Sequence, residues 1–153
     1  MANAAGIANS FKTELLQGVH VLNTTGSGIS RSSTAADSLK AALYTTGGSL
    51  SNATTAYLTT GELAGATGYT AGGLTTTGSY VSLDTATAIW QPGAAITWSG
   101  ITFNSVDAVL FYNFTAANKA IGVYTFSSQS ITAGTFTLTM PTAVAASALL
   151  RIS

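Results

Sequence analysis

The stretch Thr135-Phe136-Thr137-Leu138-Thr139 alternates strictly between hydroxyl-bearing and apolar side chains. Successive side chains of a strand point to opposite faces, so this period of two is typical of a strand with one buried and one solvated face. We therefore expect Phe136 and Leu138 to face a core and the three threonines to face outward. Pro141 has no N–H to donate to a sheet, and it ends the strand.

Similar short apolar runs, separated by turn residues, fill most of the chain before this stretch. Turns are indicated by Gln91-Pro92-Gly93, by Asn118 and by Ala133-Gly134. The strands that we expect are 39–45, 80–83, 86–90, 96–103, 108–114, 120–126, 135–139 and 149–152. Strands that recur every eight to twelve residues or so indicate an antiparallel β-sandwich of jelly-roll type. The predicted fold class is therefore mainly all-β, with one short N-terminal helix.

That helix is predicted close to the N-terminus. Asn9 or Ser10 caps it, Glu14 lies in its first turn, and Gly18 ends it. A helix of about ten residues is not stable alone, so its apolar stripe needs a surface to pack on. Either the chain's own sandwich or a neighbouring subunit provides that surface. The candidate assembly contacts are the four residues of the stripe, Phe11, Leu15, Leu16 and Val19.

The chain has 153 residues, which is the size of one domain. We expect an N-terminal arm and helix over residues 1–22, and a single β-sandwich domain over residues 23–153. The sandwich contains a Gly/Thr-rich loop region, 46–78, which is the least regular part of the sequence. The large side chains expected to anchor this loop are Tyr57, Leu63, Tyr69 and Leu74.

Charged side chains are scarce. Only 7% of the residues are Asp, Glu, Lys or Arg, against about 25% in ordinary soluble domains, and the net charge is zero. A surface of neutral hydroxyl groups suits a subunit that packs against neighbours, because few charges have to be desolvated at each contact. Five scattered cations provide no basic face for nucleic acid or for an anionic membrane surface, so we expect neither partner.

The residues also offer little for catalysis. The chain has no cysteine, which excludes disulfides and thiolate metal sites. Its single histidine, His20, lies beside the helix end, and no Gly-x-Ser-x-Gly motif accompanies it, so we expect a packing or surface residue rather than a catalytic or metal-binding one. The carboxylates are expected to cap, to close turns or to be solvated at the surface, rather than to form a glycosidase pair. They are Glu14, Asp37, Glu62, Asp84 and Asp107. We expect no enzyme, no cofactor, no metal and no small-molecule substrate.

Trp90 and Trp98 flank the Pro-Gly turn. Aromatic side chains on strands usually lie in the core, and we expect both there. A ligand platform made by one of the two rings is the alternative.

Two sequence features bear on export. Residues 1–22 lack a basic start followed by an apolar run, so we expect no signal peptide. The most apolar stretch, 143–150, is too short to span a bilayer.

Several segments, spread in order over nearly the whole chain, resemble a family of small phage and prophage virion structural proteins. They are 9–16, 37–45, 55–57, 59–62, 68–73, 108–113, 131–138 and 150–152. The resemblance implies a particle component rather than an enzyme, and it carries no catalytic motif to this chain.

On this resemblance we expect a capsid decoration (cement) protein that binds between capsomers and stabilises the head shell. The expected partners are the major capsid protein and copies of the chain itself. The expected location is the virion, after synthesis in the host cytoplasm. Two alternatives stay open at this point: a tail or fibre component that contacts the host receptor, and a small carbohydrate-binding module.

Overall fold

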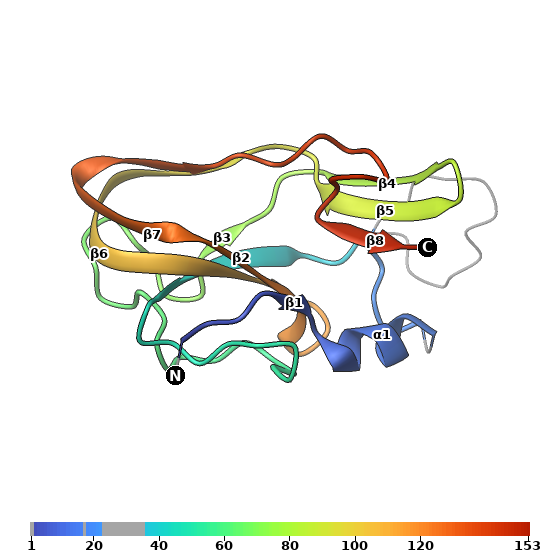
Figure 1. The fold of residues 1–153 in the computed structure, drawn as a ribbon. Helices are drawn as coiled ribbons and strands as arrows, with labels where there is room; N and C mark the ends of the chain where they lie inside the picture. Colours follow the sequence, from blue (N-terminus) through green and yellow to red (C-terminus); the bar gives the residue numbers. More distant parts are fainter. Residues whose placement is uncertain (1, 17, 23–35) are drawn as a thin grey trace.

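The computed structural model describes residues 2–16, 18–22 and 36–153 (Figure 1). Its elements are β1 (Gly6–Ile7), α1 (Asn9–Leu16), β2 (Leu39–Thr45), β3 (Leu74–Thr75), β4 (Ser79–Asp84), β5 (Thr87–Pro92), β6 (Ile96–Asn113), β7 (Lys119–Leu138) and β8 (Leu150–Ile152). All strand pairs are antiparallel. The predicted fold class, mainly β with one short N-terminal helix, is confirmed. In these ranges no helix has the length and apolarity needed to cross a bilayer.

The strands form two sheets that pack on each other. One has the order β1-β7-β6-β2-β3 and the other the order β4-β5-β8. Trp90 of β5 meets Phe111 of β6 edge-on, with 6.2 Å between ring centroids, and both rings are buried. The core therefore lies between the sheets, as in a sandwich.

The longest elements are β6 and β7, and here the sequence-based boundaries were wrong. We expected four strands, 96–103, 108–114, 120–126 and 135–139, but each pair is one continuous strand. The register of the β6–β7 pair shifts repeatedly between Ser99 and Ala108. Gly100, Ser105 and Ala133 adopt positive φ angles in this region. Bulges bend a strand without ending it, so the β6–β7 pair folds back and one part of it lies over the rest of the five-stranded sheet (Figure 1).

The alternation at the end of β7 is confirmed. Thr135, Thr137 and Thr139 are exposed, whereas Phe136 and Leu138 are partly buried against the core. The aromatic rings around Phe136 are those of Trp98, Phe103 and Phe126, at centroid distances of 5.8, 5.5 and 5.7 Å. Phe136 thus closes an aromatic cluster on the inner side of the bent hairpin.

The N-terminal segment packs on the same core. Gly6 and Ile7 pair with β7, and the side chain of Phe11 is 0% exposed. Gly18 has the left-handed conformation expected after a helix, and its N–H donates to the carbonyl of Leu15. One expectation fails: α1 begins at Asn9, so Glu14 lies beyond the first turn and bonds to side chains instead of capping.

The Gly/Thr-rich region 46–78 is anchored as expected. Leu63 and Tyr69 are buried, and Tyr57 and Leu74 are partly buried against the core. It also contains the short strand β3, which pairs with β2 and was not expected. At Gly73 the φ angle is +70°, and a Cβ there would lie 1.9 Å from the carbonyl oxygen of Ala41, so only glycine fits.

Replacing Phe136 tests the inner side of the hairpin. Phe136→Ala is expected to lower the free energy of unfolding by about 3 kcal/mol, because a ring packed among three others is lost. Thr137→Ala, on the exposed face of the same strand, is expected to cost less than about 1 kcal/mol. Urea denaturation of both variants measures the difference. Equal costs at the two positions would contradict the assigned faces.

Candidate functional site

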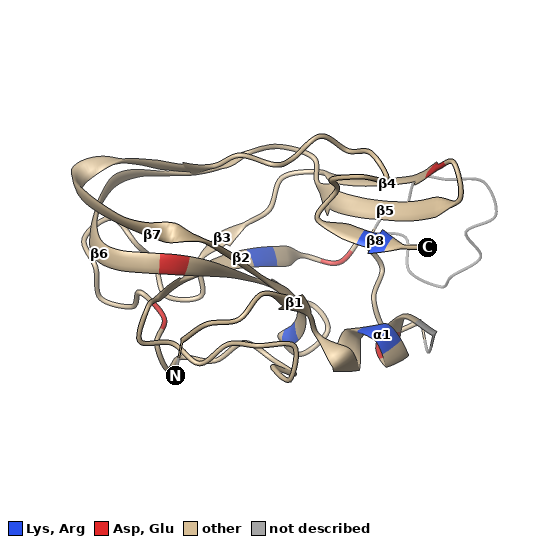
Figure 2. Ribbon diagram, in the orientation of Figure 1, with Lys and Arg blue, Asp and Glu red and all other residues tan. Residues whose placement is uncertain are grey.

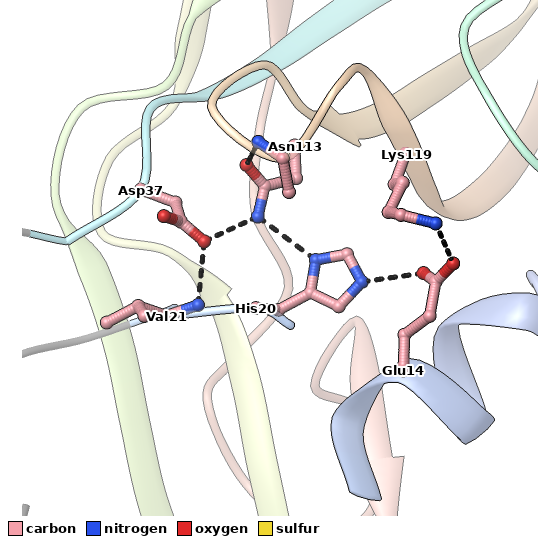
Figure 3. Close-up of polar contacts among 7 residues, drawn as sticks. Glu14, His20, Val21, Asp37, Asn113 and Lys119 are labelled. Carbon is pink, nitrogen blue, oxygen red and sulfur yellow. Dashed lines mark hydrogen bonds and ion pairs between the residues drawn. The ribbon is translucent and has the colours of Figure 1, made fainter. Parts of the chain in front are cut away.

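A buried polar network joins five segments of the chain (Figure 3). Glu14 projects from α1 and His20 from the turn after it, while Asp37 precedes β2. Asn113 ends β6 and Lys119 begins β7. Glu14, His20 and Asn113 are buried, at 7%, 6% and 0% exposure. Because the network joins an ion pair, the single histidine and a buried amide, we treat it as the candidate site.

The hydrogen bonds of Asn113 show which groups of the network donate and which accept. Its Oδ1 accepts from the N–H of Ala116 at 2.9 Å, so its Nδ2 is the group that donates inward. Nδ2 donates to Oδ2 of Asp37 at 2.6 Å and faces Nδ1 of His20 at 3.0 Å. An amide N–H can only donate, so Nδ1 of His20 accepts and the ring proton sits on Nε2. Nε2 then donates to Glu14 at 2.9 Å.

Glu14 is the charged end of the network. Its second oxygen accepts a hydrogen bond from Nζ of Lys119. Burial alone would raise the pKa of Glu14, but the hydrogen bonds from Lys119 and His20 outweigh burial and hold the pKa below its usual value. Glu14 is therefore a stable carboxylate inside the domain.

The side chains at the centre of this network are buried and hydrogen-bonded to one another. The His20 side chain is 0% exposed, and both ring nitrogens are engaged. The ring of Phe11 packs against it, with centroids 4.7 Å apart. The carboxylate of Asp37 also accepts the backbone N–H of Val21. The network thus ties the N-terminal segment to the end of β6 and the start of β7. Of the two places expected for His20, in the packed interior or at the surface, the structure has the interior one.

A second buried carboxylate, Glu62, holds the Gly/Thr-rich loop. It accepts hydrogen bonds from the hydroxyls of Tyr57 and Tyr69, at 2.5 and 2.8 Å, and from the N–H of Gly72 at 2.6 Å. Burial and then the neighbouring Glu62 raise the pKa of the Tyr57 hydroxyl, so both tyrosines stay neutral donors. The hydroxyl of Tyr112 donates to the carbonyl of Gly72, and burial raises its pKa to about 12.

The expectation that the carboxylates lie at the surface or close turns is therefore wrong for Glu14 and Glu62. Both are buried. Glu14 binds Lys119, 105 residues away, whereas Glu62 binds residues of its own loop, up to 10 residues away. The other carboxylates also have structural partners: Asp84 accepts from the N–H of Ala145, and Asp107 accepts from the amide of Asn3. The one sequence signal for Glu62 was its place between two anchoring tyrosines in a glycine-rich stretch.

The candidate assembly contacts have different environments. Phe11 is 0% exposed, so its side chain packs on its own domain and is not presented to a neighbour. Leu15 and Val19 are partly exposed, and the side chain of Leu16 lies outside the described residues. A groove of about 430 Å³ separates α1 from β8. Its lining is mainly apolar, from Ile7, Phe11, Lys12, Leu15, Leu150, Arg151, Ile152 and Ser153.

Trp90 and Trp98 are each 2% exposed, which confirms the expected core position. Neither ring forms a surface platform for a ligand.

Charged side chains are scattered over the elements and form no patch of one sign in the view of Figure 2. Among the described residues, no three His, Asp or Glu side chains gather as ligands of a metal ion. No family model, curated protein or solved structure matches the chain.

The lowered pKa of Glu14 makes a pH-dependent contribution to stability. Its carboxylate stabilises the fold above its unfolded-state pKa of about 4.3, and this contribution is lost as the pH falls through the folded-state pKa. The stability difference between wild type and Glu14→Gln should therefore be largest near neutral pH and shrink below a pH of about 4. Urea titrations at a series of pH values measure it.

Lys12→Gln is the matched control, because Lys12 is an exposed charge on the same helix. This variant should keep the pH dependence of the wild type. A difference between wild type and Glu14→Gln that does not change with pH would show that the carboxylate is not held ionised by its partners.

Proposed function

We propose that the chain is a virion structural protein, most specifically a capsid decoration (cement) protein that binds between capsomers. The observation that carries the proposal is the character of the surface. Large apolar side chains stay exposed at several places, on a chain with 7% charged residues and no net charge. They are Leu58, Tyr80, Val81, Leu83, Phe114, Val144 and Ile152.

The scarce charges support the same proposal, because many of them are used inside the domain. Glu14 and Glu62 are buried, and Asp37, Asp84 and Asp107 accept intramolecular hydrogen bonds. The remaining surface is rich in hydroxyl and apolar groups. Such a surface binds neighbours with little cost of charge desolvation and little mutual repulsion.

The proposed mechanism is mechanical. A domain with two packed sheets adds buried interface across the joints between capsomers when internal genome pressure loads them. The partners are the major capsid protein and other copies of the chain. Leu15, which lines the groove between α1 and β8, and Val19, which follows the helix, are the partly exposed contacts that we propose from the N-terminal segment. The role is structural and not catalytic, and no cofactor takes part in it.

The test is the copy number of the chain in purified particles, from cells that encode it. We expect a number that is symmetry-related to that of the shell subunit, measured by quantitative mass spectrometry. Adding the purified chain to stripped particles should also raise the temperature at which they release their genome. A few copies per particle, located at the tail, would replace the proposal by a tail or fibre component. Absence from particles would overturn it.

A further inference from the structure

Strand β4 forms an outer edge of the sheet β4-β5-β8. It pairs with β5 on one side, and no other described segment pairs with its outer side. The β4–β5 register runs without a shift from Ser79↔Pro92 to Asp84↔Thr87, so no bulge twists this edge away. A regular edge of this kind is a template for another strand.

The register shows which backbone groups point outward. Pro92 has no N–H, so Ser79↔Pro92 is a pair that exchanges no hydrogen bonds. Hydrogen-bonded and non-hydrogen-bonded pairs alternate in an antiparallel ladder, so Val81 and Leu83 also belong to non-hydrogen-bonded pairs. The N–H and C=O groups of Val81 and Leu83 therefore point away from β5, to the side on which no described segment pairs with β4.

The side chains of these two residues are also exposed. Val81 is 46% exposed and Leu83 is 69% exposed. Directly opposite residues share a face, which places Ala88 of β5 and Ile152 of β8 beside Leu83 on the same face. Ala88 is exposed and Ile152 is 51% exposed. Lysine or proline commonly protects such an edge, and β4 contains neither.

We propose that β4 pairs with β4 of a second copy, antiparallel, about a two-fold axis that passes at Ser82. In this register Val81 of one copy faces Leu83 of the other. Each of the two Val81–Leu83 pairs exchanges two backbone hydrogen bonds. The result is a continuous sheet of six strands across the two copies, with an apolar face built from Val81, Leu83, Ala88 and Ile152 of both.

A second copy fits this edge because the edge is self-complementary. The only charged residue of β4, Asp84, faces the hydroxyl-bearing Tyr80 of the other copy, so no like charges are opposed. A slip by one residue would turn the apolar side chains to opposite faces. Pairing about Val81 would set Leu83 against the polar Ser79. The register about Ser82 is the one that joins the two exposed aliphatic side chains.

This proposal deepens the assembly role proposed above by naming a surface for self-association. Its tests use the purified chain without particles. Failure of the β4 pairing would therefore leave a role in particles to be judged by copy number alone, and absence from particles would leave the dimer intact.

The first test is a disulfide across the axis. The chain has no cysteine, so Ser82→Cys introduces a single thiol. In the proposed dimer, Ser82 of one copy faces Ser82 of the other copy in a non-hydrogen-bonded pair. The Cα atoms of such a pair are about 4.5 Å apart, and this distance suits a disulfide. Oxidation with diamide should convert Ser82→Cys to a covalent dimer that retains the melting temperature of the wild type.

Two matched controls are available. Tyr80→Cys lies on the same strand but faces Asp84 of the other copy, and Leu58→Cys lies at an exposed position outside β4. Both should oxidise to dimer much more slowly than Ser82→Cys. Equal rates for the three variants would overturn the proposed register.

The second test is the mass of the protein in solution. Sedimentation equilibrium should show a concentration-dependent dimer for the wild type. Leu83→Lys should raise the dissociation constant by at least about tenfold, since a lysine then replaces a buried aliphatic side chain at the paired edge. Leu83 is largely exposed in one copy, so the variant should melt like the wild type.

Leu58→Lys is the control for added charge at an exposed apolar position, and it should dimerise like the wild type. A wild type that stays monomeric at all concentrations would overturn the proposal. So would a Leu83→Lys variant that dimerises as tightly as the wild type.

Discussion

The fold depends on the bent pairing of β6 with β7. If these two long strands were flat and regular, their hairpin would extend far beyond the other strands of the five-stranded sheet. The apolar side chains of the hairpin would then lie in water. The bulges near Gly100, Ser105 and Ala133 bend the pair. The part that pairs Ile96 with Leu138 then covers one side of the core, and the part that pairs Asn113 with Lys119 forms the other side. The part toward Asn113 and Lys119 provides fully buried side chains such as Val109, Phe111 and Ile121.

The scarcity of charge has an effect inside the domain as well as on its surface. A buried carboxylate is costly unless several donors satisfy it, and both buried carboxylates here meet that condition. Glu14 bonds to His20 and Lys119, and Glu62 bonds to two tyrosines and a backbone N–H. Each network holds a segment outside the long strands against the core: the N-terminal segment with α1 in one case and the glycine-rich loop in the other. Removing one partner would leave a buried polar group without its bond.

These internal uses of charge leave a neutral surface, and that connects the fold to the proposed role. The edge at β4 and the groove beside α1 both combine apolar side chains with few charges. In a free monomer such surfaces favour association. In a particle, where many copies meet in fixed geometry, weak contacts of this kind add up to stable binding.

The sequence alone determined the features that depend on local patterns. Alternation identified the faces of 135–139, the strand at 39–45 was found with its bounds, and Gly18 marked the helix end. The burial of Trp90 and Trp98 also followed from their places on apolar strands. These patterns reflect side-chain periodicity and backbone conformation within a few residues, which sequence carries directly.

Only the tertiary structure decided which distant segments meet. The continuity of β6 and β7 depends on bulges, and a bulge has the same local composition as a turn. The buried network unites Asp37 with Asn113, 76 residues apart, and Glu14 with Lys119, 105 residues apart. Such partners are set by the register of paired strands and by chain reversals, so no period in the sequence reveals them. For the same reason the sequence showed Val81 and Leu83 as ordinary strand residues, and only the order of the described strands placed them on the outer strand of a sheet.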